Sequence, residues 1–164
     1  MMTPDDIDVW VGLDVGKSAH HAHALDHDGN TLYDKPLKQD EKAIRTMLGK
    51  LSQHGRVLLV GSRVARGMAG RSQYAATKAA LVALARSWAA EVVASGVTVN
   101  VISPAATATA MLDDPARQQA RPRVPPLGRL IQPQEIAALA AFLLSPDAAA
   151  ITGQDIQVCG GASL

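Results

Sequence analysis

The sequence predicts an α/β fold: a single three-layer domain in which a mixed, mostly parallel sheet carries helices on both faces. Three observations lead to this expectation. The chain has 164 residues, which is enough for one domain with a substantial core. Hydrophobic residues make up 48% of it but aromatic residues only 3%, and small aliphatic side chains suit helices packed closely on a parallel sheet. Segments with the two-residue period of strands are interspersed with segments that have the period of helices.

The first sixty residues predict three strands, one helix and a fourth strand. The expected elements are strands at residues 9–15, about 18–25 and 31–35, a helix around residues 44–51, and a short buried strand at residues 57–60. In the first strand, apolar residues alternate with Trp10, Gly12 and Asp14. A turn joins the second and third strands, and it contains Gly29 and Asn30, for which a positive φ is inexpensive.

The rest of the chain predicts two main helices and two strands. The expected elements are a helix at about residues 72–94, a strand at 97–102, a helix that begins at Pro133, and a last strand at 155–159. The segment at residues 105–131 is expected to be irregular, with one candidate helix around 113–119. Gly96 ends the first helix, Pro104 stops the strand, and Pro133 suits a first helical position. Both main helices carry apolar stripes at helical spacing, namely Leu81, Leu84, Ala85, Trp88 and Val92, and Ile136, Leu139, Ala140, Leu143 and Leu144.

The charge and composition exclude several classes of protein. The formal net charge of +1 gives no argument for a nucleic-acid partner, although Arg63, Arg66 and Arg71 form a basic run that fits a solvated loop or phosphate contacts. The only cysteine, Cys159, excludes an internal disulfide and fits a reducing cytosol. No apolar run reaches the roughly 18 residues of a membrane span, and no signal-peptide pattern is present. We therefore expect a cytoplasmic protein without a membrane partner.

A tyrosine and a lysine on the first main helix form the strongest candidate for chemistry. Tyr74 and Lys78 are four residues apart, so their side chains lie on one helix face. An ammonium near a phenol stabilises the phenolate, and such a tyrosine can exchange a proton with a carbonyl or an alcohol. Ser62, at the end of the predicted strand at residues 57–60, could hydrogen-bond the same substrate oxygen. Taken alone, the Tyr-x-x-x-Lys spacing also fits a solvated helix start with an ordinary lysine.

Longer motifs surround this pair. They are Tyr74-Ala75-Ala76-Thr77-Lys78-Ala79-Ala80-Leu81, Val97-Thr98-Val99-Asn100-Val101-Ile102-Ser103-Pro104, Pro126-Leu127-Gly128-Arg129 and Ile151-Thr152-Gly153-Gln154-Asp155-Ile156. By these motifs, residues 61–164 resemble the C-terminal half of the short-chain dehydrogenase/reductase family, which has a Rossmann-like fold. The resemblance implies an oxidoreductase that uses NAD or NADP and acts on a small-molecule carbonyl or alcohol.

The resemblance also implies roles for individual residues. Tyr74 would be the catalytic acid/base, Lys78 its partner and a contact of the cofactor ribose, and Ser62 a hydrogen-bond donor to the substrate oxygen. On the cofactor side, Pro104 and Thr109 would join Tyr74 and Lys78. No residue of this half is assigned to a metal.

The chain also departs from the family pattern. Ala105 follows Pro104, whereas the family has a glycine there that lets the backbone approach the nicotinamide. The sequence has no glycine-rich strand-turn-helix of the type that holds a dinucleotide pyrophosphate. Its only candidate, Gly12-Leu13-Asp14-Val15-Gly16, would place a carboxylate beside the pyrophosphate. We therefore expect cofactor binding and oxidoreductase activity to be impaired or lost.

Residues 8–60 resemble a different family. The motifs are Val11-Gly12-Leu13-Asp14-Val15-Gly16-Lys17-Ser18, His20-His21-Ala22-His23-Ala24-Leu25-Asp26 and Asp28-Gly29-Asn30. They are similar to the start of bacterial insertion-sequence transposases with a RuvC-like nuclease domain, which implies that Asp14 is one of four metal-binding carboxylates. The other three would lie beyond residue 60, so Asp14 is only a vestigial metal candidate. The histidines are interpreted as polar strand positions.

The two parts, residues 1–60 and 61–164, are expected to share one sheet of strand order 3-2-1-4-5-6, with the second strand antiparallel. We interpret the two resemblances as a gene fusion. It would place Asp14 and Ser62 at the carboxyl ends of adjacent strands, where open α/β sheets bind ligands. Three functions remain open: an impaired reductase of the family, a transposase-derived DNA-binding or nuclease fragment, and a non-catalytic recombined protein. An Ala-rich helix face that includes Ala75, Ala79 and Ala83 would permit a homodimer.

Overall fold

One mixed sheet organises the structure. The computed structural model describes residues 9–15, 20–26, 28–37, 55–113 and 123–164. The strands are β1 (Val9–Val15), β2 (His20–Asp26), β3 (Thr31–Leu37), β4 (Arg56–Val60), β5 (Thr98–Pro104) and β6 (Asp155–Val158). They form a six-stranded sheet of order β3-β2-β1-β4-β5-β6. β2 is antiparallel to β1 and β3, whereas β1, β4, β5 and β6 run parallel. The predicted order and the antiparallel second strand are confirmed.

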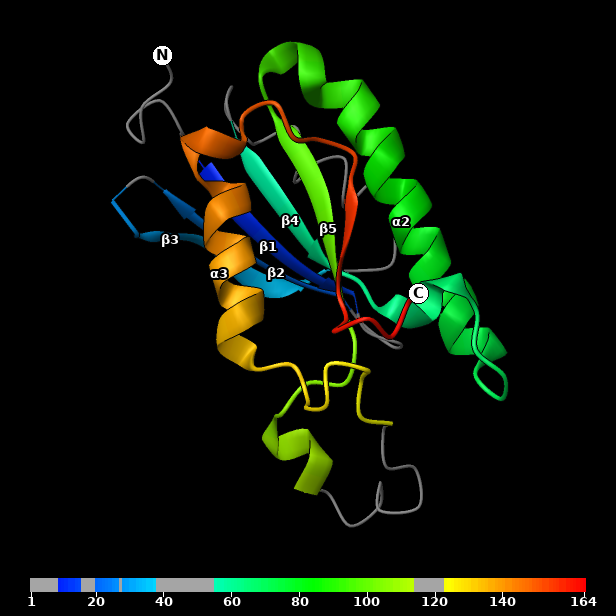
Figure 1. The fold of residues 1–164 in the computed structure, drawn as a ribbon. Coiled ribbons are helices and arrows are strands. Elements are labelled where there is room, and N and C mark those ends of the chain that lie inside the picture. Colours follow the sequence, from blue (N-terminus) through cyan, green and yellow to red (C-terminus); the bar gives the residue numbers. More distant parts are fainter. Residues whose placement is uncertain (1–8, 16–19, 27, 38–54, 114–122) are drawn as a thin grey trace.

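In the described part of the chain, the sheet is covered by the α-helices α2 (Ser72–Val92) and α3 (Pro133–Leu144), which Figure 1 shows on opposite faces. Short 3-10 helices are η2 (Arg63–Arg66), η3 (Val93–Ser95), η4 (Ala110–Asp113) and η6 (Pro146–Ala148). The three-layer α/β arrangement is therefore confirmed. The helix expected around residues 44–51 lies outside the described residues, as does most of the one considered around 113–119.

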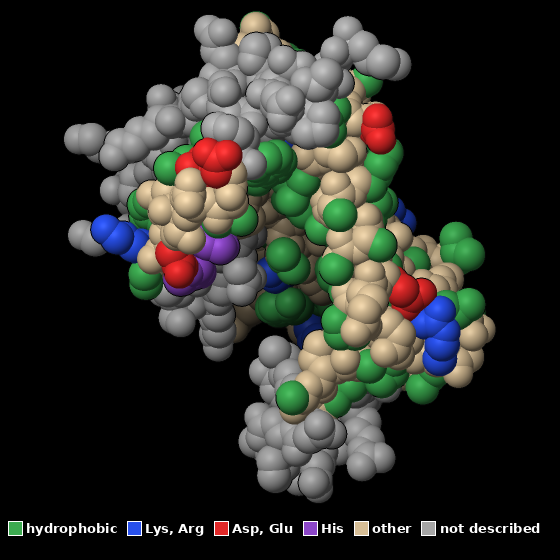
Figure 2. Space-filling view, turned by 90° about the vertical axis from the view of Figure 1, so that its left-hand side faces the viewer, with side chains coloured by type: hydrophobic (Ala, Val, Ile, Leu, Met, Phe, Trp, Pro, Cys, Tyr) green, Lys and Arg blue, Asp and Glu red, His purple; other side chains and the backbone are tan. Residues whose placement is uncertain are grey.

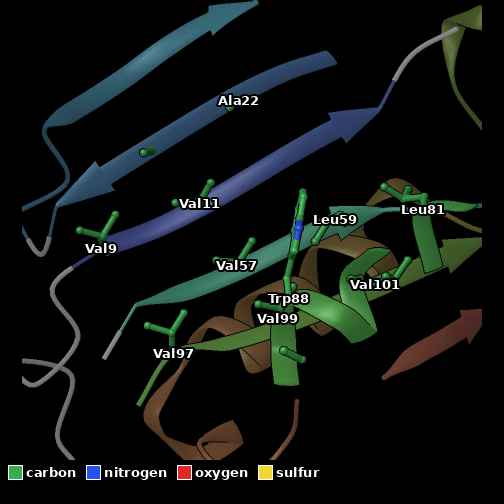
Figure 3. Packing of buried hydrophobic residues seen from close by; sticks show 13 residues of the cluster. Val9, Val11, Ala22, Val57, Leu59, Leu81, Trp88, Val97, Val99 and Val101 are labelled. Carbon is green, nitrogen blue, oxygen red and sulfur yellow. The ribbon is translucent and has the colours of Figure 1, made fainter. Parts of the chain in front are cut away.

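The sheet face under α2 holds the larger hydrophobic cluster (Figure 3). Its buried members are Val9, Val11, Ala22, Ala24, Val57, Leu59, Leu81, Ala85, Trp88, Ala89, Val97, Val99 and Val101. Trp88 projects from α2 into this cluster and is only 2% exposed, and truncating such a side chain to alanine costs about 3–5 kcal/mol. Because residues of β1 and β2 pack in the same cluster as α2, the N-terminal strands and the rest of the chain share one core.

The opposite face holds a second cluster under α3. Its buried members are Leu58, Ile102, Leu143 and Ala148, with Ile156 and Val158 of β6 packed against them. On this face the indole Nε1 of Trp10 donates a hydrogen bond to the carbonyl of Leu144, at 2.9 Å. The last carbonyls of a helix have no partner within the helix, so β1 supplies one of the bonds that α3 lacks.

The ends of both helices follow the predicted signals. The first helical segment continues from α2 through η3 to Gly96, whose φ of 74° is left-handed. α3 begins at Pro133, and the backbone N–H of Gln132 donates to the Glu135 carboxylate at 2.8 Å. Arg129 donates two further hydrogen bonds to Glu135, at 2.8 and 2.9 Å. In the part of the chain that the structure describes, neither helix is long and apolar enough to cross a bilayer.

Candidate active site

The candidate site begins where β4 ends. The N–H of Gly61 donates to the carbonyl of Ile102 at 2.8 Å, which continues the pairing between β4 and β5. A Cβ at Gly61 would lie 2.5 Å from Ser103 Oγ and 2.6 Å from Val101 Cγ1. Both distances are shorter than real Cβ contacts, so only glycine lets the chain leave β4 so close to β5. This passage delivers Ser62 to the carboxyl end of the parallel sheet.

Ser62 is fixed by the short helix that follows it. Its backbone is extended and it forms the N-cap of η2, where its Oγ accepts a hydrogen bond from the N–H of Val64 at 3.3 Å. The side chain is half-buried, and η2 packs against α2. The hydroxyl therefore retains its proton for donation, because the contact with Val64 uses only an oxygen lone pair.

Lys78 is buried and tied to the end of β4. It is 5% exposed, although it is a lysine on a helix. Its Nζ donates to the carbonyl of Val60 at 3.0 Å, and it lies 5.9 Å from the ring centroid of Tyr74. A buried ammonium is retained only with partners, so the Val60 carbonyl holds this charge beside the tyrosine ring. Tyr74 itself is 42% exposed, so its side chain remains accessible to a substrate.

A pocket of about 350 Å³ lies over this pair. Its lining comes from the turn before α2 and from the first two turns of the helix: Gly70, Arg71, Ser72, Gln73, Tyr74, Thr77 and Lys78. The structure thus brings Tyr74 and Lys78 together in one cavity. None of these lining residues carries a negative charge.

The other residues predicted for the site, Ser62, Pro104 and Thr109, do not line this pocket. Ser62 is two residues beyond Val60, the residue that Lys78 binds. Pro104 ends β5 opposite Val158 of β6. Thr109 is exposed next to η4, beyond the carboxyl end of the sheet. Ser62 thus follows the strand end that Lys78 binds, whereas Thr109 belongs to a separate segment.

The N-terminal candidates have a different arrangement. The backbone of Asp14 pairs with Val60 in the register of β1 and β4, so β1 and β4 end together as predicted. His21 and His23 are exposed on β2, and His21 hydrogen-bonds Asp34 of β3. That bond lowers the pKa of Asp34. Figure 2 shows histidine and acidic side chains together on this side of the molecule. Within the described residues, no three acidic, histidine or cysteine side chains form a metal-binding group.

Sequence reasoning missed one buried polar residue, which holds the sheet together at the amino end of β6. Asn100 is 1% exposed in the centre of β5. Its amide donates to the carbonyl of Ile151 at 2.7 Å, and its side-chain oxygen accepts from the N–H of Gln154 at 3.1 Å. Asn100 therefore fixes the loop that leads into β6. The available signal was its place as the one amide side chain in a β-branched strand, since a buried amide needs such partners.

The Tyr74–Lys78 pair therefore lies at the carboxyl end of β4, the strand that Ser62 follows, which is the arrangement that the resemblance to the short-chain dehydrogenase/reductase family led us to expect. A family model described as "Enoyl-(Acyl carrier protein) reductase" matches residues 41–163. The chain belongs to the short-chain dehydrogenase/reductase family. The match begins at residue 41, so residues 41–60, which we had grouped with the N-terminal part, also match the reductase family model.

Individual relatives agree with this assignment. The chain is 44% identical over 129 residues to the 3-oxoacyl-(acyl-carrier-protein) reductase FabG of Vibrio cholerae, covering 76% of this chain and 52% of that protein. It is 43% identical over 129 residues to FabG of Escherichia coli K12, with the same coverage. The chain therefore spans about half the length of the curated relatives it matches.

Solved structures show the same likeness. A blue fluorescent protein from a metagenomic library, in complex with NADPH, has a TM-score of 0.66 and 33% identity, covering 74% of this chain and 51% of that one. The angucycline C-6 ketoreductase LanV with bound NADP has a TM-score of 0.66 and 27% identity, covering 74% of this chain and 49% of that one.

Proposed function

We propose that this chain carries the proton-transfer site of an NAD(P)-dependent oxidoreductase that acts on a small-molecule carbonyl or secondary alcohol. The observation that carries the proposal is the pocket in which accessible Tyr74 lies beside the buried ammonium of Lys78. The family membership and the NADPH and NADP complexes of similar structures support it.

In this proposal each residue has a defined task. The Tyr74 hydroxyl gives its proton to the substrate carbonyl oxygen during reduction and removes it during oxidation. The ammonium of Lys78 stabilises the phenolate that this leaves behind. Ser62 donates a hydrogen bond to the same substrate oxygen, which lowers the energy of the developing negative charge.

The residues fit only one end of a nicotinamide cofactor. Tyr74 and Lys78 would hold its ribose, and Pro104 and Thr109 would lie toward the nicotinamide, which supplies or accepts the hydride when bound. The sequence has no glycine-rich loop for the pyrophosphate, and Ala105 stands where the family has glycine. We therefore propose that the chain binds the cofactor weakly and that its activity is impaired.

Calorimetry with NADPH and NADH tests this proposal, combined with turnover of a simple ketone and with Tyr74→Phe and Lys78→Ala. We expect weak binding that Tyr74→Phe weakens only slightly further, through one lost ribose contact, while it lowers turnover by about 10²–10⁴-fold, the size of an acid/base contribution. Lys78→Ala should weaken both. Equal turnover by wild type and Tyr74→Phe would refute the assignment, and circular dichroism would show whether each variant is folded.

We propose further that residues 1–60, in the part that precedes the family match at residue 41, derive from a bacterial insertion-sequence transposase and were joined to the reductase part by gene fusion. The supporting observation is the β3-β2-β1-β4 order with β2 antiparallel, which matches the RuvC-like arrangement expected for that family. With Asp14 as a solitary candidate ligand, we expect neither metal-dependent cleavage nor specific DNA binding. A gel shift at low ionic strength that survives an excess of unrelated competitor DNA would contradict this expectation.

The proposed assembly is a homodimer. Of the expected Ala-rich face of α2, Ala79 and Ala83 are exposed, whereas Ala75 is buried in the core. Small residues permit close packing between helices, and in the family, by resemblance, this helix and the last strand form subunit contacts. Light scattering on the intact chain should give twice the 17.2 kDa chain mass. A monomer at all accessible concentrations would refute the dimer without affecting the proton-transfer proposal.

A further inference from the structure

The residues around the pocket carry a one-sided charge. Between Glu41 and Glu91 the sequence contains no acidic residue, whereas it contains nine lysines and arginines. Three arginines of this stretch, Arg63, Arg66 and Arg71, lie in η2 and at the start of α2. The segment that lines the pocket is therefore basic, which the net charge of +1 conceals, and the pocket lining itself contains Arg71 and Lys78 but no acidic residue.

The three arginines are not equivalent. The guanidinium of Arg63 donates to the carbonyl of Ala162 at 3.1 Å, so it ties the C-terminal segment to η2. Arg66 is exposed and is not one of the pocket-lining residues. Arg71 is exposed and lines the pocket, and within the described part of the chain its guanidinium has no hydrogen bond or ion pair. Arg71 alone combines an available charge with a place in the cavity wall.

Arg71 is also well placed relative to Tyr74. It is the N-cap residue of α2, three positions before the tyrosine, and both residues line the same pocket. A substrate whose carbonyl oxygen reaches the Tyr74 hydroxyl can thus present a second group to Arg71. A planar guanidinium binds a carboxylate through two parallel hydrogen bonds, which gives it geometric selectivity as well as charge.

We propose that Arg71 determines substrate specificity and that the preferred substrates are oxo acids, in which a carboxylate bound by Arg71 accompanies the carbonyl presented to Tyr74. This inference rests on the proposed function of the site and extends it to a substrate class. A neutral ketone would leave Arg71 unused and would bind without a fixed orientation.

Matched acid and ester probes test this inference without cofactor. Calorimetry would compare acetoacetate and levulinate with their methyl esters on the intact chain. We expect the acids to bind about tenfold more tightly than the esters, which is the size of a charge-assisted bidentate pair. Arg71→Gln should abolish this ratio, and Arg86→Gln is the control because Arg86 is an exposed arginine of the same helix outside the pocket. The ratio should also shrink at high ionic strength.

The outcomes separate this inference from the proposed function. Equal binding of acids and esters by wild type, or a ratio that survives in folded Arg71→Gln, would overturn the role of Arg71. A ratio that depends on Arg71 in a protein without any cofactor-dependent turnover would support the inference and count against the oxidoreductase proposal. Tyr74→Phe should retain the ratio, because the phenol contacts the carbonyl and not the carboxylate.

Discussion

The strands on the two sides of β1 are buried in different ways. In β4 every residue from Arg56 to Leu59 is buried, and in β5 only the last residue is even partly exposed. In β2 the pattern alternates, with Ala22 and Ala24 buried and His21 and His23 exposed. The cause is that α2 and α3 sandwich β4 and β5, whereas β2 contributes to the core only on the α2 side. Substitutions should therefore be tolerated on the exposed face of β2, in the hairpin that β2 forms with β3, and on neither face of β4 and β5.

The largest expected loss of stability tests whether only one face of β2 belongs to the core. Ala22 is fully buried, so Ala22→Asp would place an unpaired carboxylate in the cluster that contains Trp88. Leaving a charge buried without a partner costs about 3–5 kcal/mol, which is enough to unfold many small domains. His23→Asp is the matched control, since His23 is exposed on the same strand. Urea denaturation should separate the two variants, and equal stabilities would show that β2 does not belong to the core.

The next effect contrasts a glycine of the central sheet with one of the N-terminal strands. Gly61→Ala would force a Cβ to within 2.5 Å of Ser103 Oγ, whereas a Cβ at Gly12 would meet only the carbonyl of His23 at 4.0 Å. Overpacking of this kind costs about 1–3 kcal/mol, while Gly12→Ala should be neutral or slightly stabilising because glycine weakens strand interiors. Thermal denaturation would measure both. A neutral Gly61→Ala would mean that the β4–β5 contact relaxes easily.

The same difference in burial decides how much of the fold the sequence could predict. The alternation in β1 and β2 and the apolar runs in β4 and β5 identify both kinds of strand, and their combination predicts the sheet order that the structure confirms. The ends of strands are less predictable. β4 begins at Arg56, because its guanidinium donates to the carbonyl of Gly96 at 3.2 Å and can therefore be buried. That partner is forty residues away in the chain, and no local pattern reveals it.

The candidate site shows a similar division. The helical spacing of Tyr74 and Lys78 predicts a shared face, and they do line one pocket. The burial of Lys78 and its bond to Val60 follow from how α2 packs across the end of β4, which is a property of the tertiary structure. The place of Arg71 in the pocket wall depends on where α2 begins, so the sequence shows only a basic run.

A smaller loss of stability is expected at the contact between β1 and α3. Trp10→Phe would remove the hydrogen bond from β1 to the Leu144 carbonyl while it keeps an aromatic ring in place. We expect a loss of about 1 kcal/mol, the usual net contribution of one such bond. The loss should be visible in chemical denaturation with an unchanged denaturant slope. A slope that falls would instead indicate that β1 detaches from α3 before the rest of the protein unfolds.

The smallest expected effects on stability come from two exposed carboxylates, Glu135 at the start of α3 and Asp34 on β3. The pKa of Glu135 is lowered to about 2, first by the Arg129 hydrogen bonds and then by the Gln132 N–H. A carboxyl whose folded pKa lies below its ordinary value of 4.5 stabilises the fold above that value, and this contribution is lost as the pH falls toward about 2. Wild type should therefore melt slightly above Glu135→Gln near neutral pH, and the difference should shrink below pH 4.5.

Asp34→Asn is the counterpart in the hairpin, where hydrogen bonding by His21 lowers the pKa of the carboxyl. The loss of stability should be smaller than for Glu135→Gln, because the Asp34 carboxylate has one exposed imidazole as its partner. The Glu135 carboxylate has two guanidinium hydrogen bonds and a backbone N–H, which together hold the start of α3. Melting temperatures of both variants across acidic pH would rank them. A larger loss for Asp34→Asn would mean that the edge of the sheet at β3 contributes more to stability than its one-sided burial implies.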